Sequence, residues 1–452
     1  LNLIYIFGKH DKIEFSLNMA RFLQKFTSLQ LCVINGRRFL MRSFSSWKCL
    51  LNRPLILGIE TSCDDTGAAV VDGFGNIHGE ELSSQQSYSS RFGGVIPTFA
   101  KRQHMANVET VVNGALTKSG ITLQNLDAIA VTNKPGMPVC LRVGVDYATN
   151  LCRISRKPLI PVHHMAAHAF VVRLAEPRVQ FPFLCLLMSG GHCILLLVKS
   201  VRDFLTLGNS LDIAPGEAFD KVGQELKFEF LFFFKFLPVV ARRLQLYHVE
   251  AVDEHLSGGV LVQKYARGGD RCSFEFPQPL RRRDCNFSFT GLTSAAVRHI
   301  EKLESSRDVP IRYDVQLLAN FCASFQHALF RHIAKRLLRA FEYVTHRSLL
   351  QTDGHKCLVI SGGVASNEYF RSGFQFVCSN SGYELRCPPP ELCTDNGTMI
   401  AWYGAEKYNV GYEVLHNLPE QIPISARDPL GEDASNDISE LQIAPSRMKF
   451  NF

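Results

Sequence analysis

Two histidines separated by four positions could bind one metal ion. His164 and His168 lie in the segment Pro161–His168, which reads PVHHMAAH. On a helix this spacing puts both imidazoles on the same face, within reach of a single ion, although such pairs are more often structural. The helix of many metalloproteases reads H-E-x-x-H, and its glutamate is the general base. Met165 takes that position here, so hydrolysis by a metal-bound water lacks its base.

A metal site of this kind needs a third ligand. The segment LCTDNG places the carboxylate of Asp395 just before a predicted helix over residues 398–408. The residues alone favour an N-terminal helix cap for Asp395 over metal binding. If Asp395 instead joins the two histidines, the set of two imidazoles and one carboxylate suits iron, zinc or another divalent ion.

Three turns rich in glycine and hydroxyl groups could hold a phosphate through their backbone amides. They cover residues 61–66, 189–191 and 362–363. Each follows a strand pattern, and a helix N-terminus near such a turn adds a favourable dipole for an anion. Each turn alone is weak evidence, but three at strand ends together favour a nucleotide-binding cleft.

The strands that position these turns recur in the same order along the chain. The patterns cover residues 55–60, 68–71 and a strand near Ile77, then 183–188, 193–198 and 204–207, and finally 357–360. The last of them leads into a helix that begins after Ser366 and Asn367. We therefore predict a duplicated α/β domain with a cleft between two lobes.

The composition indicates a globular protein with reduced thiols. Of the 452 residues, 46% are apolar and 20% are charged, which suffices for a core and for two or three domain-sized units. The 14 cysteines contain no C-x-x-C pair, so we expect neither a disulfide framework nor a zinc ribbon. No apolar run reaches the roughly 18 residues of a membrane-spanning helix.

The net charge of +7 is concentrated near the N-terminus. Residues 19–53 contain seven arginine and lysine residues and no acidic residue. This composition is typical of a mitochondrial transit peptide, and the alternative is a basic tail that binds nucleic acid. Met19 and Met41 are candidate start sites, and either start would leave residues 1–18 outside the natural protein.

Eight sequence blocks, in their order and spacing, resemble the tRNA N6-adenosine threonylcarbamoyltransferases, once described as O-sialoglycoprotein endopeptidases. The blocks are GIETSCDDT (58–66), GGVIPTFA (93–100) with Arg102 and His104, PVHHMAAH (161–168), SGGH (189–192), LDIAPGEAFDK (211–221), NFSFTGL (286–292), SGGVASN (361–367) and CTDNGTMIA (393–401). The resemblance covers about residues 54–430. The sequences KPG at 134–136 and LDIAPG at 211–216 look like the mitochondrial branch of the family.

The resemblance implies an actin/sugar-kinase/Hsp70-like fold of the α/β class. Residues 54–178 and 396–430 would form the first lobe, and residues 179–395 the second. Residues 1–53 would be the transit peptide, and residues 431–452 a C-terminal tail.

The resemblance also implies roles for individual residues. His164, His168 and Asp395 would bind one divalent metal ion per subunit, iron or zinc. The residues implied in substrate binding are Leu187, Met188, Ser189, Gly190, Gly191, Asp220, Gly259, Gln263, Ser366, Asn367 and Thr394. Asp64 and Asp65 match the acidic pair of the first loop, and one of them is the candidate general base.

The implied reaction transfers a threonylcarbamoyl group from threonylcarbamoyl-AMP to N6 of the adenosine beside the anticodon. The substrates would be mitochondrial tRNAs that read codons beginning with A. A separate synthase would supply the donor, and the enzyme would be a homodimer in the mitochondrial matrix. A metalloendopeptidase and an actin-fold ATPase or sugar kinase are the alternative functions.

Three features depart from the family pattern. Ala166 stands where many members have glutamate, so a role for that carboxylate cannot apply here; Gln263 also replaces a glutamate, but its amide can still hydrogen-bond a ribose hydroxyl. Residues 223–240 form a phenylalanine-rich insertion that would expose a large apolar patch unless it were buried. We interpret the insertion as a gene-model error or retained intron, and a lineage-specific loop is the alternative.

Two basic segments could contact RNA phosphates. A predicted helix over residues 317–344 carries a basic face, for which we favour simple solvent exposure over a tRNA contact. Its basic residues are Arg331, Lys335, Arg336 and Arg339. The run Arg281–Arg283 is a similar candidate.

Overall fold

The computed structural model describes residues 32–34, 37–39, 53–92, 94–224, 257–280, 282–306, 311, 314–350, 356–444, 448–450 and 452. They fall into two compact units, Leu1–Arg53 and Pro54–Phe452. In the first unit the described residues form an antiparallel pair of strands, β1 (Cys32–Ile34) and β2 (Arg37–Phe39). The rest of the predicted transit peptide, and residues 225–240 of the insertion, lie outside the described residues.

The first sheet of the second unit has five strands in the spatial order β5-β4-β3-β6-β7. Its strands are β3 (Ile56–Glu60), β4 (Asp65–Val71), β5 (Ile77–Ser84), β6 (Ala128–Lys134) and β7 (Leu159–His163). β3, β4 and β5 pair antiparallel, whereas β6 and β7 run parallel to β3. Every residue of β3 is buried, which agrees with its continuous apolar pattern at the centre of the sheet.

The second sheet has six strands in the order β12-β11-β8-β9-β10-β13. They are β8 (Phe183–Met188), β9 (Cys193–Val198), β10 (Phe204–Asn209), β11 (Cys357–Ser361), β12 (Glu384–Arg386) and β13 (Glu432–Asp433). β8, β9 and β10 pair antiparallel, and β11 and β12 run parallel to β8. β13, from the segment expected to be a tail, adds to the edge of this sheet beside β10.

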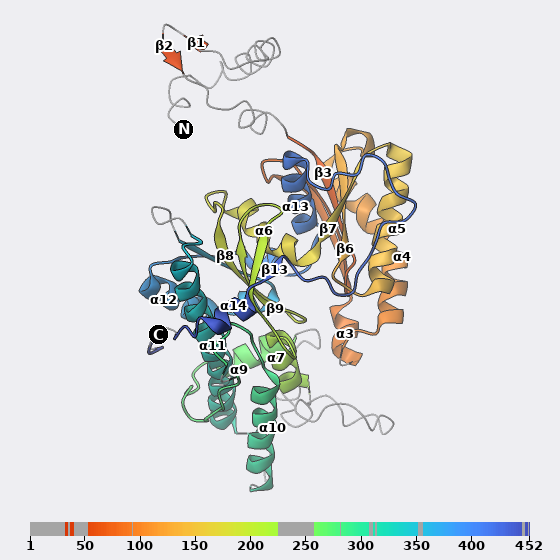
Figure 1. Cartoon of the computed structure of the whole chain (residues 1–452). Helices are drawn as coiled ribbons and strands as arrows, with labels where there is room; N and C mark the ends of the chain where they lie inside the picture. Colours follow the sequence, from red (N-terminus) through yellow and green to blue (C-terminus); the bar gives the residue numbers. More distant parts are fainter. Residues whose placement is uncertain are drawn as a thin grey trace. The chain divides into compact units, whose positions relative to one another are not determined.

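The two sheets repeat one topology. If the strands of each sheet are numbered along the chain, the first sheet has the order 3-2-1-4-5, and the second has the same order with the same parallel and antiparallel neighbours once its sixth strand, β13 at the edge, is set aside. The predicted duplicated α/β fold is therefore confirmed, and Figure 1 shows the two sheets as separate groups flanked by helices. The strand predicted at 357–360 is β11, the counterpart of β6, and it completes the second sheet.

Helices connect the strands and cover the sheets. They are α3 (Gln86–Phe92), α4 (Pro97–Ser119), α5 (Pro138–Ser155), α6 (His164–Ala175), α7 (Pro215–Gln224), α9 (Gly258–Ala266), α10 (Thr290–Ser305), α11 (Val315–His346), α12 (Glu368–Ser381), α13 (Gly397–Val410) and α14 (Ser435–Glu440). One buried apolar cluster joins residues of both sheets to α6 and α13. These two helices therefore form the layer between the lobes, and residues at their N-termini face the junction.

Glycines allow α13 to lie against the first sheet. A Cβ atom at Gly58 of β3 would lie 2.2 Å from the backbone nitrogen of Ala401, and one at Gly397 would lie 2.3 Å from the carbonyl carbon of Ala68. No side chain fits at either position, because backbone atoms are the obstacles. This close packing fixes the start of α13, and with it the position of Asp395.

The interpretation of the basic helix face as solvent-exposed is wrong for two of its residues. Arg336 and Arg339 of α11 are only 5% and 6% exposed. The guanidinium of Arg336 donates hydrogen bonds to the carbonyls of Asn286, Pro279 and Leu280. The guanidinium of Arg339 donates to the carbonyls of Asp284 and Ile443. Both cations bind loops of the protein itself, so neither is available to a phosphate.

We expect Arg336→Met to lower the free energy of unfolding by roughly 2–4 kcal/mol, because three carbonyls lose a charged donor. Arg331→Met, on the exposed part of the same helix, should change it by no more than about 0.5 kcal/mol. Urea unfolding followed by circular dichroism measures both values. Equal effects of the two substitutions would contradict a structural role for Arg336.

Candidate metal and nucleotide site

The three predicted metal ligands meet at the junction of the lobes. His164 is the first residue of α6, directly after β7, and His168 lies one turn later. Asp395 lies between the short helix η5 (Pro390–Leu392) and α13. Its Oδ1 is 3.0 Å from Nε2 of His168 and 3.5 Å from Nε2 of His164. One donor atom of each residue thus lies within 4.8 Å of the others, as a shared cation requires.

The predicted role of Asp395 as a helix cap is wrong. The side chain of Asn396 caps α13 instead, because its Oδ1 accepts a hydrogen bond from the amide of Met399 at 2.8 Å. Asp395 precedes this cap, and its carboxylate faces the two histidines.

Glu60 belongs to the site, although no role was predicted for it from the sequence. It is the last residue of β3 and is fully buried. Its Oε2 lies 3.1 Å from Nδ1 of His164 and accepts a hydrogen bond from the hydroxyl of Thr132, while its Oε1 accepts one from the amide of Ser62. Because Nδ1–H of His164 donates to Glu60, Nε2 keeps its lone pair for a metal. A charge at the end of an apolar strand was the available signal.

The charges around the histidines suit a divalent cation. Burial lowers the pKa of His164, but the carboxylates of Asp395 and Glu60 outweigh burial and raise this pKa to about 9. Burial raises the pKa of Asp395, but His164 and His168 outweigh burial and hold this pKa well below its usual range. Two ionised carboxylates therefore surround two imidazoles, and a bound cation would take over the positive charge of a proton on His164. Two imidazole nitrogens and one carboxylate oxygen fit iron or zinc.

The two acidic residues of the first loop differ in their surroundings. Asp65 begins β4, and its Oδ1 is buried without a hydrogen-bond partner among the described residues. Burial raises the pKa of Asp65 to about 7; a hydrogen bond with Ser84 opposes this shift and the carboxylate of Asp395 adds to it. Asp64 instead accepts a hydrogen bond from the hydroxyl of Ser89 at 2.8 Å. Asp65 is thus the better candidate for proton transfer near neutral pH.

His104 of α4 holds this loop in place. Its Nε2 lies 2.9 Å from the carbonyl of Cys63, so this nitrogen must carry the proton and donate. Its Nδ1 then accepts a hydrogen bond from the hydroxyl of Thr66 at 2.8 Å. Burial lowers the pKa of His104, which keeps the ring neutral and this pattern intact. The R-x-H block of the sequence thus supports the loop that carries Asp64 and Asp65.

The raised pKa of Asp65 predicts a pH-dependent stability. The folded state binds this proton more tightly than the unfolded chain, so the contribution of Asp65 is most favourable below pH 3.8 and is lost as the pH rises through about 7. We expect the difference in free energy of unfolding between Asp65→Asn and the wild type to shift in favour of the variant by about 2–3 kcal/mol when the pH is raised from 5 to 8. Urea unfolding of metal-free protein at both pH values measures this gain, with the exposed Asp146→Asn as control. A gain that does not change with pH would contradict the buried carboxylate.

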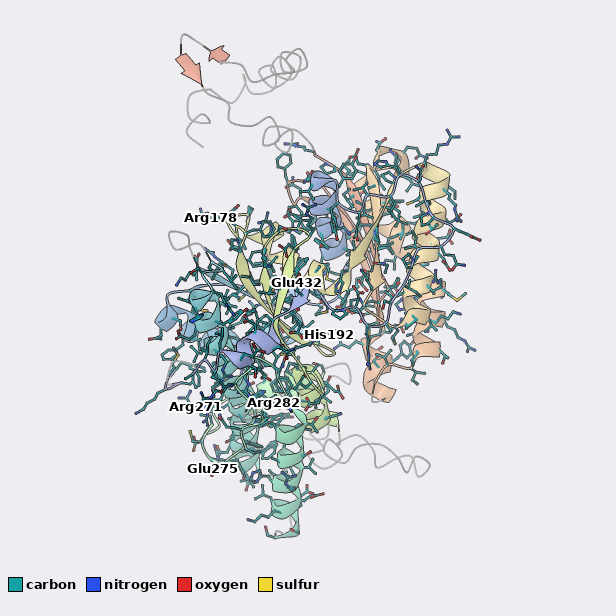
Figure 2. The ribbon with its side chains drawn as sticks, in the orientation of Figure 1. Arg178, His192, Arg271, Glu275, Arg282 and Glu432 are labelled. Atoms are coloured by element: carbon teal, nitrogen blue, oxygen red, sulfur yellow. The ribbon has the colours of Figure 1, made fainter. Side chains whose placement is uncertain are left out.

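The turn at residues 189–191 precedes His192, on which the charges of the metal ligands act. Gly190 and Gly191 are exposed, and a Cβ atom on either would meet nothing within 4 Å. The hydroxyl of Ser189 accepts a hydrogen bond from the amide of His192 at 3.0 Å. Burial, and then His164 and His168, lower the pKa of His192 to about 4, so this imidazole is neutral and close to the metal group. Figure 2 shows His192 between the two lobes.

The side chains of Leu187 and Met188 do not face this turn. Both residues are fully buried in β8, in two different core clusters. Only their main-chain atoms could contact a ligand, so the predicted role of this segment is restricted to the backbone.

The remaining predicted binding residues fall into two groups. The amides of Gly258 and Gly259, at the start of α9, donate hydrogen bonds to Asp220, and burial raises the pKa of Asp220 to about 6. Gln263 lies one turn further along α9 and is half-buried. No hydrogen bond among the described residues links this group to the metal ligands.

The second group precedes α12 and α13. Asn367 caps α12 through its Oδ1 and donates from Nδ2 to Oε1 of Gln326 at 3.0 Å. Ser366 donates to the carbonyl of Gly363 and, like Thr394, is exposed. Ser366 and Thr394 can therefore contact a ligand directly, whereas both ends of the Asn367 amide are already bound.

Comparison with known proteins identifies the family. Residues 76–402 match the family described as tRNA N6-adenosine threonylcarbamoyltransferase. The chain belongs to this family. The mitochondrial enzyme of Rattus norvegicus is 43% identical over 92% of this chain and 95% of its own length, and that of Homo sapiens is 42% identical over 88% and 92%. These values confirm both the resemblance and its mitochondrial branch.

Solved structures are more distant. The chain is similar to HypF from T. kodakarensis, with a TM-score of 0.48 and 16% identity over 85% of this chain and 52% of that one. It is also similar to component A of (R)-2-hydroxyglutaryl-CoA dehydratase from Acidaminococcus fermentans, with a TM-score of 0.39 and 14% identity over 79% and 99%. Within the described residues, no helix has the length and apolar character needed to cross a membrane.

Proposed function

We propose that this member of the family transfers the threonylcarbamoyl group from threonylcarbamoyl-AMP to N6 of the adenosine adjacent to the anticodon. The tRNAs concerned are mitochondrial and read codons that begin with A. The observation that carries the proposal is the meeting of His164, His168 and Asp395 within 4.8 Å of one another, with His192, at the end of the turn 189–191, subject to their charges. A cation site next to exposed backbone amides suits a substrate that carries both an acyl group and a phosphate.

His164, His168 and Asp395 would hold one iron or zinc ion per subunit. When bound, the ion would act as a Lewis acid that polarises the carbamoyl carbonyl and offsets the phosphate charge. Glu60 orients His164 for this task through its hydrogen bond to Nδ1.

The other residues bind and orient the two substrates. The amides of residues 189–191 would hold the phosphate of the donor, and Asp220 with Gly259 and Gln263 would contact its ribose and adenine. Ser366, Asn367 and Thr394 would border the adenosine pocket. Holding both substrates in line removes most of the entropic cost of their encounter.

Asp65 is the candidate general base for the amine. N6 of the tRNA adenosine attacks the carbamoyl carbon, a C–N bond forms, and the C–O bond to the phosphate of AMP breaks. N6 loses one proton in this step, and Asp65 accepts it because its pKa of about 7 leaves it partly ionised at neutral pH.

The proposal extends to location and partners. The basic segment at residues 1–53 would direct the chain to the mitochondrial matrix, and a separate synthase would supply the donor there. Residues 54–178 with 396–430 would form one lobe, and residues 179–395 the other, to which residues 431–452 add the edge strand β13 and the helix α14. We also propose a homodimer.

A reconstituted reaction tests the proposal. Metal-loaded protein is incubated with threonylcarbamoyl-AMP and unmodified mitochondrial tRNA, and the nucleosides are analysed by mass spectrometry. We expect threonylcarbamoyladenosine and an equal amount of AMP. Peptide cleavage, or ATP turnover without tRNA, in place of the modified nucleoside would instead support the endopeptidase or the ATPase.

A further inference from the structure

A cavity of about 380 Å³ lies between the segment 271–279 and α11. Cavities of roughly 300–1,000 Å³ are typical of sites for small ligands, and this volume suits one nucleotide. Its lining combines two guanidiniums, two phenylalanine rings and two histidines, which are Arg271, Arg331, Phe274, Phe276, His327 and His332. None of these residues has a part in the transfer site described above.

The cavity adjoins the predicted adenosine pocket through consecutive residues of α11. Gln326 accepts the hydrogen bond from Asn367 at 3.0 Å. The next residue, His327, lines the cavity, and its Nδ1 is 2.6 Å from the hydroxyl of Tyr369, two residues beyond Asn367. The start of α12 therefore packs against the middle of α11. Asn367, at the predicted adenosine pocket, and His327, at the cavity, both lie along this contact.

The charges of the lining favour an anion. The lining contains two arginines and one acidic residue, Glu275, so its net formal charge is +1 when the histidines are neutral. Burial, and then the charges of Arg271 and Arg331, lower the pKa of His327 to about 4, so that both cations act on the interior of the cavity. Arg271 donates a hydrogen bond to the main-chain carboxylate of Phe452, the last residue of this sequence, at 2.5 Å, which holds the guanidinium in place and offsets part of its charge. Arg331 is exposed and makes no hydrogen bond or ion pair with the described residues.

The apolar part of the lining suits a base. Phe274 and Phe276 are partly buried and lie against the core of the second lobe. Their contacts with Phe321, at 5.3 Å and 6.1 Å between ring centroids, are T-shaped, so the rings are fixed in orientation. Fixed aromatic rings beside cations are the usual means of binding an unpaired base and its phosphate.

We propose that this cavity binds one nucleotide of the tRNA strand that carries the target adenosine, with its phosphate at Arg271 and Arg331 and its base at Phe274 and Phe276. The proposal rests on the proposed function, because it assumes a tRNA substrate. A nucleotide held here would fix the RNA strand while the adenosine enters the neighbouring pocket. The site would thus contribute to tRNA binding and leave binding of the acyl donor unaffected.

Three substitutions of single charges test the proposal. Arg331→Gln removes a cation from the cavity, Glu275→Gln removes its one acidic residue, and Arg178→Gln removes an exposed cation outside the cavity. Figure 2 shows Arg178 well separated from Arg271 and Glu275. Each metal-loaded, full-length variant is assayed for kcat and for KM with tRNA and with threonylcarbamoyl-AMP.

We expect Arg331→Gln to raise the KM for tRNA about 10-fold, with an unchanged KM for the donor and unchanged kcat at saturating tRNA. Glu275→Gln should lower the KM for tRNA by about 2- to 5-fold, and Arg178→Gln should leave it within about 2-fold of the wild type. Binding of an anticodon stem-loop RNA, measured by fluorescence anisotropy against salt, should lose about one unit of slope in Arg331→Gln.

Equal KM values for tRNA in Arg331→Gln and Arg178→Gln, with an active wild type, would overturn the proposal and leave the transfer function intact. The proposal would also be overturned, with the transfer function intact, if an acidic peptide bound to the cavity and the anticodon stem-loop RNA did not. A wild-type protein that modifies no tRNA would instead refute the proposed function itself.

Discussion

Replacement of His168 by alanine is expected to reduce threonylcarbamoyl transfer by at least about 100-fold and to remove the bound metal. Nε2 of His168 is the donor atom nearest to Asp395, at 3.0 Å, and the ring is almost fully buried. With one imidazole absent, a single histidine and a carboxylate remain, which is too few protein ligands for a stable iron or zinc site. Metal content is measured by inductively coupled plasma mass spectrometry, and transfer by nucleoside analysis of the tRNA.

His416→Ala is the matched control, because His416 is an exposed histidine on the segment after α13. It should retain both metal and activity. Full transfer by a metal-free His168→Ala protein would contradict any role of a metal in this reaction. Retention of metal with loss of transfer would assign His168 to the chemistry instead of to metal binding.

Substitution of Glu60 by glutamine should weaken metal binding by about 10- to 100-fold, the usual effect of losing a partner behind a metal ligand. The buried carboxylate accepts hydrogen bonds from Nδ1 of His164, from the Thr132 hydroxyl and from the Ser62 amide. A glutamine amide places an N–H group against one of these donors and removes the charge that favours the cation. Activity should therefore fall at limiting metal and recover when metal is added in excess.

Recovery of transfer activity in excess metal would show that Glu60 positions His164 for metal binding and does not take part in the reaction itself. Thr132→Val removes one donor to Glu60 and keeps its charge, so it should cost less than about 10-fold in metal affinity. A metal titration followed by transfer activity, together with thermal unfolding of each variant, separates affinity from folding. If Glu60→Gln binds metal as tightly as the wild type, the orienting role of Glu60 is refuted.

Local spacing was sufficient to predict much of the site. The strands around residues 56–71 and 183–198 follow from apolar runs, and their turns follow from glycine and hydroxyl residues, because these preferences act over a few neighbouring residues. The four-residue separation of His164 and His168 sufficed for the same reason: a helix brings such residues together by itself.

The role of Asp395 depended on contacts that local spacing does not contain. Asp395 and Asn396 are adjacent, and either could cap α13, so the residues alone favoured the wrong one. Asn396 caps the helix and Asp395 meets His168, which is 227 positions away in the chain. The packing of α13 against β3, at Gly58, decides which of the two side chains faces the histidines.

Burial likewise separated residues that look alike in the sequence. Arg331 and Arg336 occupy one predicted basic helix, yet only Arg331 is exposed, because the loop at Pro279 and Leu280 covers Arg336. Glu60 was hidden in an apolar strand, and its three donors come from separate segments. The sequence by itself determined which elements form and which residues could do chemistry, since both depend on near neighbours. The tertiary structure alone decided which charges are buried, and therefore which of them act on one another.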